Sequence, residues 1–362
     1  MKFKKICSIL LIMALLMSLV GCAGNNNSDN DKNAGNAGND ASKQTEITNA
    51  KMLEMEEVLM SQLQPLPETN TGDKIGMLVI TLTNPFWVGM KEAYEAAGKE
   101  LGVEVEVMAA PTENDSKSQL ETLQAMTAKD FKALIISPIE PFNLVPGVVQ
   151  ANNQGIKVIN LGPGIDTEAV ANAGGKLDGR ICVDFEEQGK LAAEYMVEKM
   201  GAEGGKVAII QGIPGAGQSE GRTAGAKKVF ENAPNVELVS IQPANWDRNT
   251  AYNIATNLLQ AHPDLKGIFS CNDVMALAAA DALEAAGQRE GKIIFGVDFI
   301  NEAAEAIKAG KLDGSIAYSS TVYAKAAVLL ALKNIQGHEV GTVFSPLAIV
   351  TTENIDEYEG WK

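Results

Sequence analysis

The feature that most constrains this chain is a regular alternation of short apolar segments with amphipathic segments, which begins at Lys74. The apolar segments are rich in β-branched and aliphatic residues, which is typical of buried strands, and the segments between them carry apolar residues at helical spacing. Such alternation is typical of doubly wound parallel sheets, whose ligands bind beyond the carboxyl ends of the strands. The predicted strands cover residues 75–82, 103–108, 132–137, 156–161, 206–211, 236–241, 267–271, 292–297 and 314–318.

The length and composition of the chain agree with an α/β protein of two domains. It has 362 residues, of which 46% are hydrophobic and 5% aromatic. A chain of this length forms about two domains and can bury an ample core.

The N-terminal 21 residues are typical of an export signal. Three lysines among the first five residues precede an apolar run from Ile6 to Val20, which is too short for a comfortable membrane span. The ending Leu19-Val20-Gly21-Cys22 resembles a bacterial lipobox, which implies cleavage before Cys22 and attachment of lipid to its thiol. We therefore expect an extracytoplasmic protein anchored to the bacterial cell membrane.

Residues 22–72 are predicted to be a lipidated, disordered tether. The stretch after Cys22 is rich in Asn, Gly, Asp and Ser and has too few large apolar residues to fold. Residues 46–64 within this range show a short helical pattern that ends before two prolines. We assign that pattern no function.

Charge and the scarce cysteines and histidines exclude several classes of function. The net charge is −16, and it becomes −19 when the three signal lysines are removed, which argues against nucleic acid binding. No Cys/His spacing indicates a metal site, and His262 and His338 are the only histidines. Cys182 and Cys271, in apolar strand-like runs, are expected to be buried free thiols, although a disulfide between them is an alternative.

The segment from residue 75 to 102 predicts a ligand-facing corner between a strand and a helix. Asn84-Pro85-Phe86-Trp87 opens the helix, and Gly102 ends it. Aromatic rings at such a corner can cover the C–H face of a sugar while an amide binds a hydroxyl group. Alternatively, Phe86 and Trp87 only pack the helix onto the sheet.

Residues 74–351 resemble the exported ribose/galactose-type sugar-binding proteins of ABC transporters, which share their fold with the LacI-type repressors. A repressor would begin with a helix-turn-helix, whereas this chain begins with a signal and a lipobox. The resemblance rests on segments that occur in family order: TLTNPFWVGM, GRTAGA, QPANWDRNTAY, LLQAHPDLKGIFSCNDVMALAA, IFGVDFINEA and KLDGSIAYSS.

The resemblance implies two lobes, each a doubly wound parallel sheet, joined by three chain crossings near residues 182–186, 317–321 and 345–349. The N-terminal lobe would comprise residues 73–183 and 319–346, and the C-terminal lobe residues 184–318 and 347–362. It further implies a monomer that closes around a monosaccharide without a cofactor and then docks on a membrane permease. A receptor for a sensor kinase or chemoreceptor, and a receptor for a furanone-type signal, stay open as alternatives.

The family's ligand positions can be transferred residue by residue. Several positions also have structural interpretations, with Asn272 and Asp298 as helix N-caps, Arg222 as a surface salt-bridge residue and Trp246 as core. The implied ligand-binding residues are Asn84, Phe86, Trp87, Ser137, Arg222, Trp246, Asn272, Asp298 and Tyr318.

Departures from the family pattern bear on the identity of the sugar. Gly162-Pro163 stands where ribose-binding members carry an Asp-Arg pair, and Ser137 and Tyr318 replace an Asn and a Gln. Because the hydrogen bonds of a charged pair are lost, we expect a neutral monosaccharide (a pentose, hexose or 6-deoxyhexose) other than ribose. Examples are a sugar with an apolar substituent at that end, such as a 6-deoxyhexose, and a differently arranged pentose or polyol.

An enzymatic interpretation rests on Gly217-Gln218-Ser219-Glu220-Gly221, which matches the GxSxG motif of serine hydrolases. A nucleophile of this type sits on a sharp turn directly after its strand, whereas several loop residues precede Ser219. Neither histidine is placed to serve as its base. We therefore predict a protein that is not an enzyme.

Overall fold

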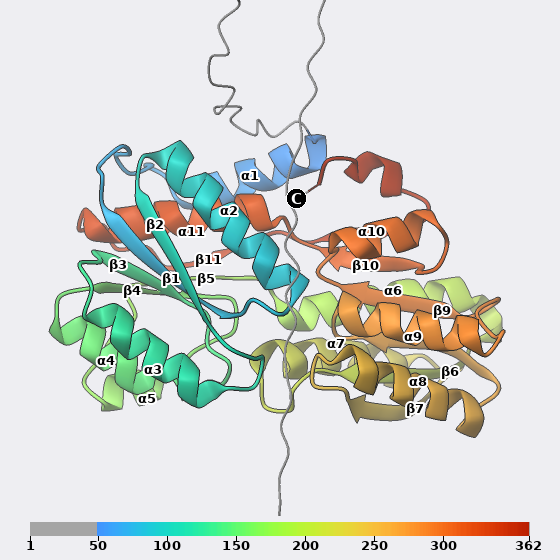
Figure 1. The fold of residues 1–362 in the computed structure, drawn as a ribbon. Coiled ribbons are helices and arrows are strands. Elements are labelled where there is room, and N and C mark those ends of the chain that lie inside the picture. The colour runs from blue at the N-terminus through green and yellow to red at the C-terminus, as the bar shows by residue number, and fades with distance from the viewer. Residues whose placement is uncertain (1–48, 362) are drawn as a thin grey trace, which may run out of the picture. The chain divides into compact units, whose positions relative to one another are not determined.

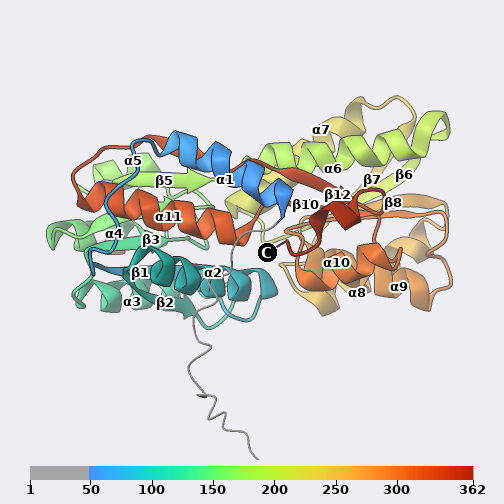
Figure 2. The same cartoon turned by 90° about the horizontal axis from the view of Figure 1, so that it is seen from above.

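The computed structural model describes residues 49–361, so the predicted signal peptide and Cys22 lie outside the described residues. Two six-stranded sheets, each covered by helices on both faces, form two lobes (Figures 1 and 2). This confirms the predicted α/β class. Among residues 49–361, no helix has both the length and the apolar character needed to cross a membrane.

The first lobe contains a fully parallel sheet in the order β11-β5-β4-β3-β1-β2. Its strands are β1 (Lys74–Thr81), β2 (Glu104–Ala110), β3 (Ala133–Ile136), β4 (Lys157–Leu161), β5 (Gly179–Cys182) and β11 (Thr342–Phe344), and its helices are α1 (Ala50–Gln62), α2 (Pro85–Leu101), α3 (Ser116–Thr127), α4 (Val145–Asn153), α5 (Thr167–Asn172) and α11 (Ser320–Ile335).

The second lobe has the order β12-β10-β9-β8-β6-β7, and it is parallel except that β12 runs antiparallel to β10. Its strands are β6 (Gly205–Gln211), β7 (Val236–Pro243), β8 (Leu265–Ser270), β9 (Ile293–Val297), β10 (Gly314–Ala317) and β12 (Ala348–Thr351), and its helices are α6 (Phe185–Met200), α7 (Gly217–Asn232), α8 (Arg248–Ala261), α9 (Asp273–Ala285) and α10 (Asn301–Lys308), with 3₁₀ turns η1 (Gly201–Glu203) and η2 (Ile355–Tyr358).

The chain passes between the two sheets after β5, after β10 and between β11 and β12. The strands β11 and β12, next to the third passage, were absent from the predicted strands, and β5 was recognised only as the strand-like run around Cys182. β11 has three residues and β12 has four, and each pairs at the edge of its sheet.

Local sequence explains the corner between β1 and α2. Strand β1 is buried along nearly its whole length, as expected for a central parallel strand covered on both faces. Asn84 caps α2 by accepting a hydrogen bond from the backbone N–H of Phe86, and Pro85 occupies the first turn. Gly102 ends the helix with φ +65°, a left-handed conformation that glycine adopts without strain.

Helix α1 corrects part of the predicted tether. Residues 50–62 are helical, as the pattern within residues 46–64 indicates, but they pack on the first lobe instead of belonging to a disordered chain. Met52, Met55 and Leu59 are buried in the main core, so this segment buries enough apolar surface to fold.

Candidate ligand-binding site

A cavity lies between the lobes, beyond the carboxyl ends of their strands. It encloses about 480 Å³ including its open mouth. Both lobes and the passages between them contribute side chains, and the lining consists of Asn84, Phe86, Trp87, Glu113, Leu161, Gly162, Pro163, Val183, Phe185, Gln218, Arg222, Trp246, Asn272, Asp298, Tyr318 and Tyr323.

The first lobe presents an amide and two aromatic rings from the start of α2. Asn84 is held at both ends, because its Oδ1 accepts from Phe86 N at 3.0 Å while its Nδ2 donates to Glu113 Oε1 at 2.7 Å. The Phe86 ring meets Trp87 edge to face at 4.9 Å and lies 5.4 Å from the ring of Tyr318. Trp87 is buried in the core and also lines the cavity. It therefore packs α2 onto the sheet and also contributes to the cavity lining.

Glu113, in the loop between β2 and α3, lines the cavity but was not among the predicted residues. Burial raises the pKa of its carboxyl to about 7, the charge of Asp298 adds to this effect, and the hydrogen bond from Asn84 opposes it. In sequence, Thr112-Glu113-Asn114 is typical of an ordinary polar turn. The signal that could have found Glu113 is its position in the short loop that follows a predicted strand, at the same sheet edge as Asn84.

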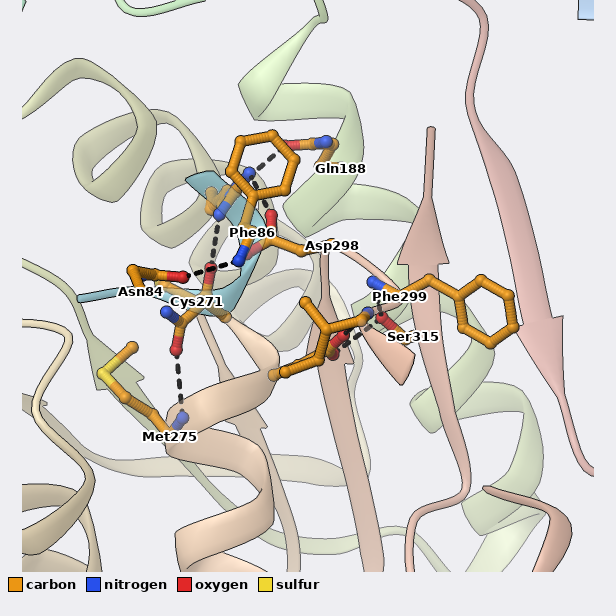
Figure 3. A network of polar contacts seen from close by, with 12 residues as sticks. Asn84, Phe86, Gln188, Cys271, Met275, Asp298, Phe299 and Ser315 are labelled. Carbon is orange, nitrogen blue, oxygen red and sulfur yellow. Dashed lines mark hydrogen bonds and ion pairs between the residues drawn. The ribbon is translucent and has the colours of Figure 1, made fainter. Parts of the chain in front are cut away.

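Arg222 is the central charged group of the second lobe, and it is buried instead of lying on the surface. Its Nε donates to Gln188 Oε1 at 2.7 Å, its Nη1 to Cys271 O at 2.7 Å, and its Nη2 to Asp298 Oδ1 at 3.0 Å. Figure 3 labels these three partners. Burial raises the pKa of Asp298 to about 6, although the positive charge of Arg222 acts in the opposite direction.

The position of Arg222 depends on a close crossing of α6 and α7. A Cβ added at Gly189 would lie 1.9 Å from Arg222 O, and one added at Gly225 would lie 1.9 Å from Glu186 O. Glycine at both positions therefore lets the two backbones approach one another. This approach places Gln188 of α6 within hydrogen-bonding distance of the Arg222 side chain.

Trp246 lies at the cavity in an unusual backbone conformation. Asn245 and Trp246 have φ values of +55° and +65°, in the left-handed region that side chains other than glycine rarely adopt. The indole covers Gly212, where an added Cβ would lie 2.1 Å from ring atoms. Trp246 is 7% exposed and belongs to the core cluster, so the core interpretation and the cavity position hold together.

Asn272 and Asp298 differ in their local roles. Asn272 caps α9 by accepting from Met275 N at 3.0 Å, and it also lines the cavity. Asp298 does not cap a helix, because the N-cap of α10 is Ile300. Asp298 instead has φ +107° and is followed by Phe299 at φ +53°. Such strained backbone is concentrated at functional sites.

Tyr318 lines the cavity at the end of β10, whereas Ser137 does not. Ser137 is buried at the end of β3, where its carbonyl oxygen accepts from Gln119 Nε2 at 2.8 Å. The Gln119 side chain in turn accepts from Asn143 Nδ2 at 2.7 Å. These amides occupy the space beyond the end of β3, so the structure does not bring Ser137 to the other predicted residues.

Gln218 is a second lining residue that the sequence did not single out for ligand binding. It lies in the first turn of α7, and its buried Oε1 has no hydrogen-bond partner within residues 49–361. A buried polar atom without a partner is costly unless another group satisfies it. A ligand hydroxyl group in the cavity would do so.

The geometry does not support hydrolysis at Ser219. Its side chain is fully buried inside the first turn of α7, and its Oγ has no hydrogen-bond partner among the described residues. His262 lies at the end of α8 and His338 follows α11, and neither lines the cavity. Cys182 and Cys271 are buried free thiols, so the alternative disulfide does not form.

Comparisons with known proteins agree with this geometry. Residues 75–339 match the periplasmic binding protein domain family. A D-allose-binding periplasmic protein from Escherichia coli K12 is 39% identical over 237 residues, which cover 66% of this chain and 76% of the relative. A ribose import binding protein from Bacillus subtilis 168 is 31% identical over 288 residues, which cover 78% of this chain and 90% of the relative. The crystal structure of an ABC transporter periplasmic solute binding protein from Actinobacillus succinogenes 130z with bound D-allose superposes with a TM-score of 0.76 at 32% identity, covering 79% of this chain and 100% of that one. The chain belongs to the periplasmic binding protein family, among the non-catalytic sugar-binding components of ABC transporters.

Proposed function

We propose that this protein is a lipid-anchored extracytoplasmic receptor that captures one neutral monosaccharide and delivers it to an ABC transporter permease. The observation that carries this proposal is the composition of the cavity, where aromatic rings and polar side chains from both lobes meet. A pyranose has apolar C–H faces and a rim of hydroxyl groups. The rings of Phe86 and Trp246 suit the faces, and Asn272, Gln218 and Asp298 suit the rim.

The charges around the cavity favour a neutral ligand. Arg222 is the only lining cation among the described residues, and its ion pair with Asp298 neutralises it. Glu113 adds a carboxyl group whose pKa is about 7, so a second negative charge appears as the pH rises. A phosphorylated or carboxylated sugar would meet no unpaired cation in this lining. We therefore expect sugar phosphates and uronic acids not to bind.

One end of the cavity is apolar, which bears on the identity of the sugar. Leu161, Gly162 and Pro163 line it at the end of β4, without the charged pair expected of a ribose-binding member. A methyl group or an uncharged ring substituent suits this end better than a hydroxyl group that needs charged partners. The apolar end therefore makes 6-deoxyhexoses the ligands to test ahead of ribose. D-allose is tested with them because two of the similar proteins bind it.

Capture would follow from the two-lobe arrangement. Ligand contacts are divided between the lobes, so only a closed arrangement can make all of them at once. A micromolar dissociation constant requires about −8 kcal/mol, which is well within the ceiling for a sugar of about 10 to 12 heavy atoms. No cofactor is needed, and a monomer suffices for this role.

The deciding experiment is isothermal titration calorimetry on protein that begins at residue 23, so that α1 is retained. The panel contains D-allose, D-fucose, L-rhamnose, D-xylose, D-ribose, xylitol and a furanone, with a sugar phosphate as the charged comparison. Trp246→Ala should abolish measurable binding, while Phe142→Ala is the matched aromatic control because Phe142 is 61% exposed and outside the cavity. Binding of the furanone alone would replace the sugar proposal, and tighter binding of D-ribose than of every 6-deoxyhexose would overturn the inference from the apolar end.

The anchor and the partner require separate tests. The lipobox resemblance supports acylation at Cys22, so Cys22→Ala protein should leave the membrane fraction and lose its lipid mass. Cys22→Ala protein that stayed in the membrane fraction would contradict the anchor. Loss of sugar uptake after deletion of the gene supports a permease partner, whereas intact uptake with loss of a sugar-induced response supports a sensor kinase or chemoreceptor.

A further inference from the structure

Helix α1 is firmly attached to the first lobe. Glu56 accepts a hydrogen bond from Lys325 Nζ of α11 at 2.7 Å. The buried Lys333 Nζ donates to Leu63 O at 2.9 Å and to Pro65 O at 2.6 Å, just beyond the end of α1. The methionines and leucine on the inner face of α1 are buried in the core. Within residues 49–361, this helix therefore behaves as part of the first lobe.

The residue that begins α1 is bonded to the second lobe. Asn49 Oδ1 accepts from Lys51 N at 2.9 Å and Met52 N at 3.1 Å, which caps the helix. The Nδ2 of the same side chain donates to Glu357 O at 2.8 Å and Glu359 O at 3.0 Å, in the segment around η2. Asn49 is 7% exposed, so water does not compete freely for these bonds. One amide thus ties a first-lobe helix to the C-terminal segment.

The C-terminal segment follows β12 and packs on the second lobe next to the cavity. The ring of Phe299 lies 6.0 Å from Tyr358 and 6.3 Å from Trp361, and these two rings are 5.2 Å apart. Phe299 directly follows Asp298, which pairs with Arg222 in the cavity lining. Both views place α1 between α11 and the C-terminal segment (Figures 1 and 2).

We propose that α1 is a non-covalent strap between the lobes, which favours the arrangement in which both lobes border the cavity and thereby strengthens ligand binding. The three chain passages permit hinge motion, and the strap adds a fourth connection that such motion must stretch or break. Its two bonds from Asn49 Nδ2 cross between the lobes, so they contribute to the equilibrium between lobe arrangements and not only to the stability of one lobe. The inference goes beyond the proposed function, and it uses that function only for its ligand readout.

The test uses a substitution that distinguishes the capping oxygen of the Asn49 side chain from the nitrogen that donates to the second lobe. Asn49→Asp keeps an oxygen that caps α1 but removes both donors to the second lobe. Asn49→Ser is the uncharged second variant, which keeps a capping oxygen on a shorter side chain. The control is Glu56→Gln, which weakens the α1–α11 contact within the first lobe and leaves Asn49 in place.

The distance between the lobes is measured without ligand by double electron–electron resonance. The spin labels are attached to Lys117→Cys in the first lobe and Lys228→Cys in the second, where both native side chains are exposed. We expect both Asn49 variants to shift the distance distribution away from that of the wild type. We also expect weaker D-allose binding by roughly 5- to 30-fold, which is the change that one or two net hydrogen bonds produce. Circular dichroism checks that the variants are folded, and Glu56→Gln should change the affinity less than about twofold.

The outcomes separate the strap from the proposed ligand. Unchanged distances in both Asn49 variants, or an equal shift in Glu56→Gln, would overturn the strap. A shift in the Asn49 variants together with no sugar binding by the wild type would keep the strap and reject the proposed function. Tighter sugar binding in the Asn49 variants would show that α1 favours the open arrangement, which contradicts the proposed direction.

Discussion

Replacing Glu113 by glutamine should stabilise this protein, and it should do so only when the pH is high enough to ionise the native carboxyl. Glu113 is half-buried at the cavity, faces the charge of Asp298 and has no cationic partner among the described residues. The introduced amide has nearly the same shape as the carboxyl, and its oxygen can still accept the bond that Asn84 Nδ2 donates to Oε1. The substitution therefore removes an ionisation without removing a contact.

The sign of the pH dependence follows from the direction of the shift. The pKa of Glu113 is raised from 4.5 to about 7, so the folded protein binds this proton more tightly than the unfolded chain. The resulting stabilisation is complete below pH 4.5 and is lost as the pH rises through about 7. The difference between these two pKa values corresponds to roughly 3.4 kcal/mol, and partial exposure reduces this to about 2 kcal/mol.

Thermal unfolding of the ligand-free protein at about pH 5 and about pH 8 measures this effect. A gain of about 2 kcal/mol corresponds to an increase in Tm of roughly 4–8 °C for a lobe of this size. We expect that increase for Glu113→Gln at the higher pH and a much smaller one at the lower pH. The matched control is Glu121→Gln, an exposed carboxylate of the same lobe. An equal gain at both pH values, or a loss at the higher one, would refute burial as the cause of the raised pKa.

Three further predictions concern packing around the site. Gly212→Ala should weaken sugar binding by about tenfold or more in calorimetry, because its Cβ would lie 2.1 Å from the Trp246 ring and must displace it. Unchanged affinity would show that the ring position does not matter. Gly225→Ala should lower the unfolding free energy by about 1–3 kcal/mol in urea titrations, because the clash is with the backbone of α6, and a stabilised variant would contradict the close crossing. Lys333→Met should cost about 1–3 kcal/mol in thermal unfolding, since it leaves Leu63 O, whose bond is buried, and Pro65 O, whose bond is part-buried, without this donor. An unchanged Tm would mean that water replaces it.

Much of the fold was predictable because its signals are local. Nine predicted strands correspond to observed strands within a few residues, and the Asn84-Pro85 start and Gly102 end of α2 follow from capping and glycine chemistry. The short β11 and β12 strands were not predictable in this way. Each lies at the edge of a sheet, β11 beside β5 and β12 beside β10, so its strand conformation depends on pairing with residues far away in the chain.

Most of the side chains predicted at a strand end or a strongly marked turn line the cavity. Asn84, Trp246, Asn272 and Asp298 all line the cavity, and Asn84 and Asn272 also cap helices. Ser137 also follows a strand end, but buried amides from α3 and the following loop occupy the space beyond it. Glu113 was missed because its surroundings, and not its neighbours in sequence, bury it and raise its pKa.

The sequence by itself determined the α/β class and the alternation of strands and helices, because these depend on periodicity, caps and the ends of parallel strands. Its resemblance to a known family further indicated half of the side chains that line the cavity. Only the tertiary structure decided how those side chains are paired. Arg222 reaches Gln188 because α6 and α7 cross closely at glycines, and it reaches Cys271 and Asp298 because the ends of β8 and β9 lie beside it. Helix α1 reaches the C-terminal segment while its apolar face packs on the first lobe. Contacts between residues so far apart in the chain depend on how helices and sheets pack, which no local pattern encodes.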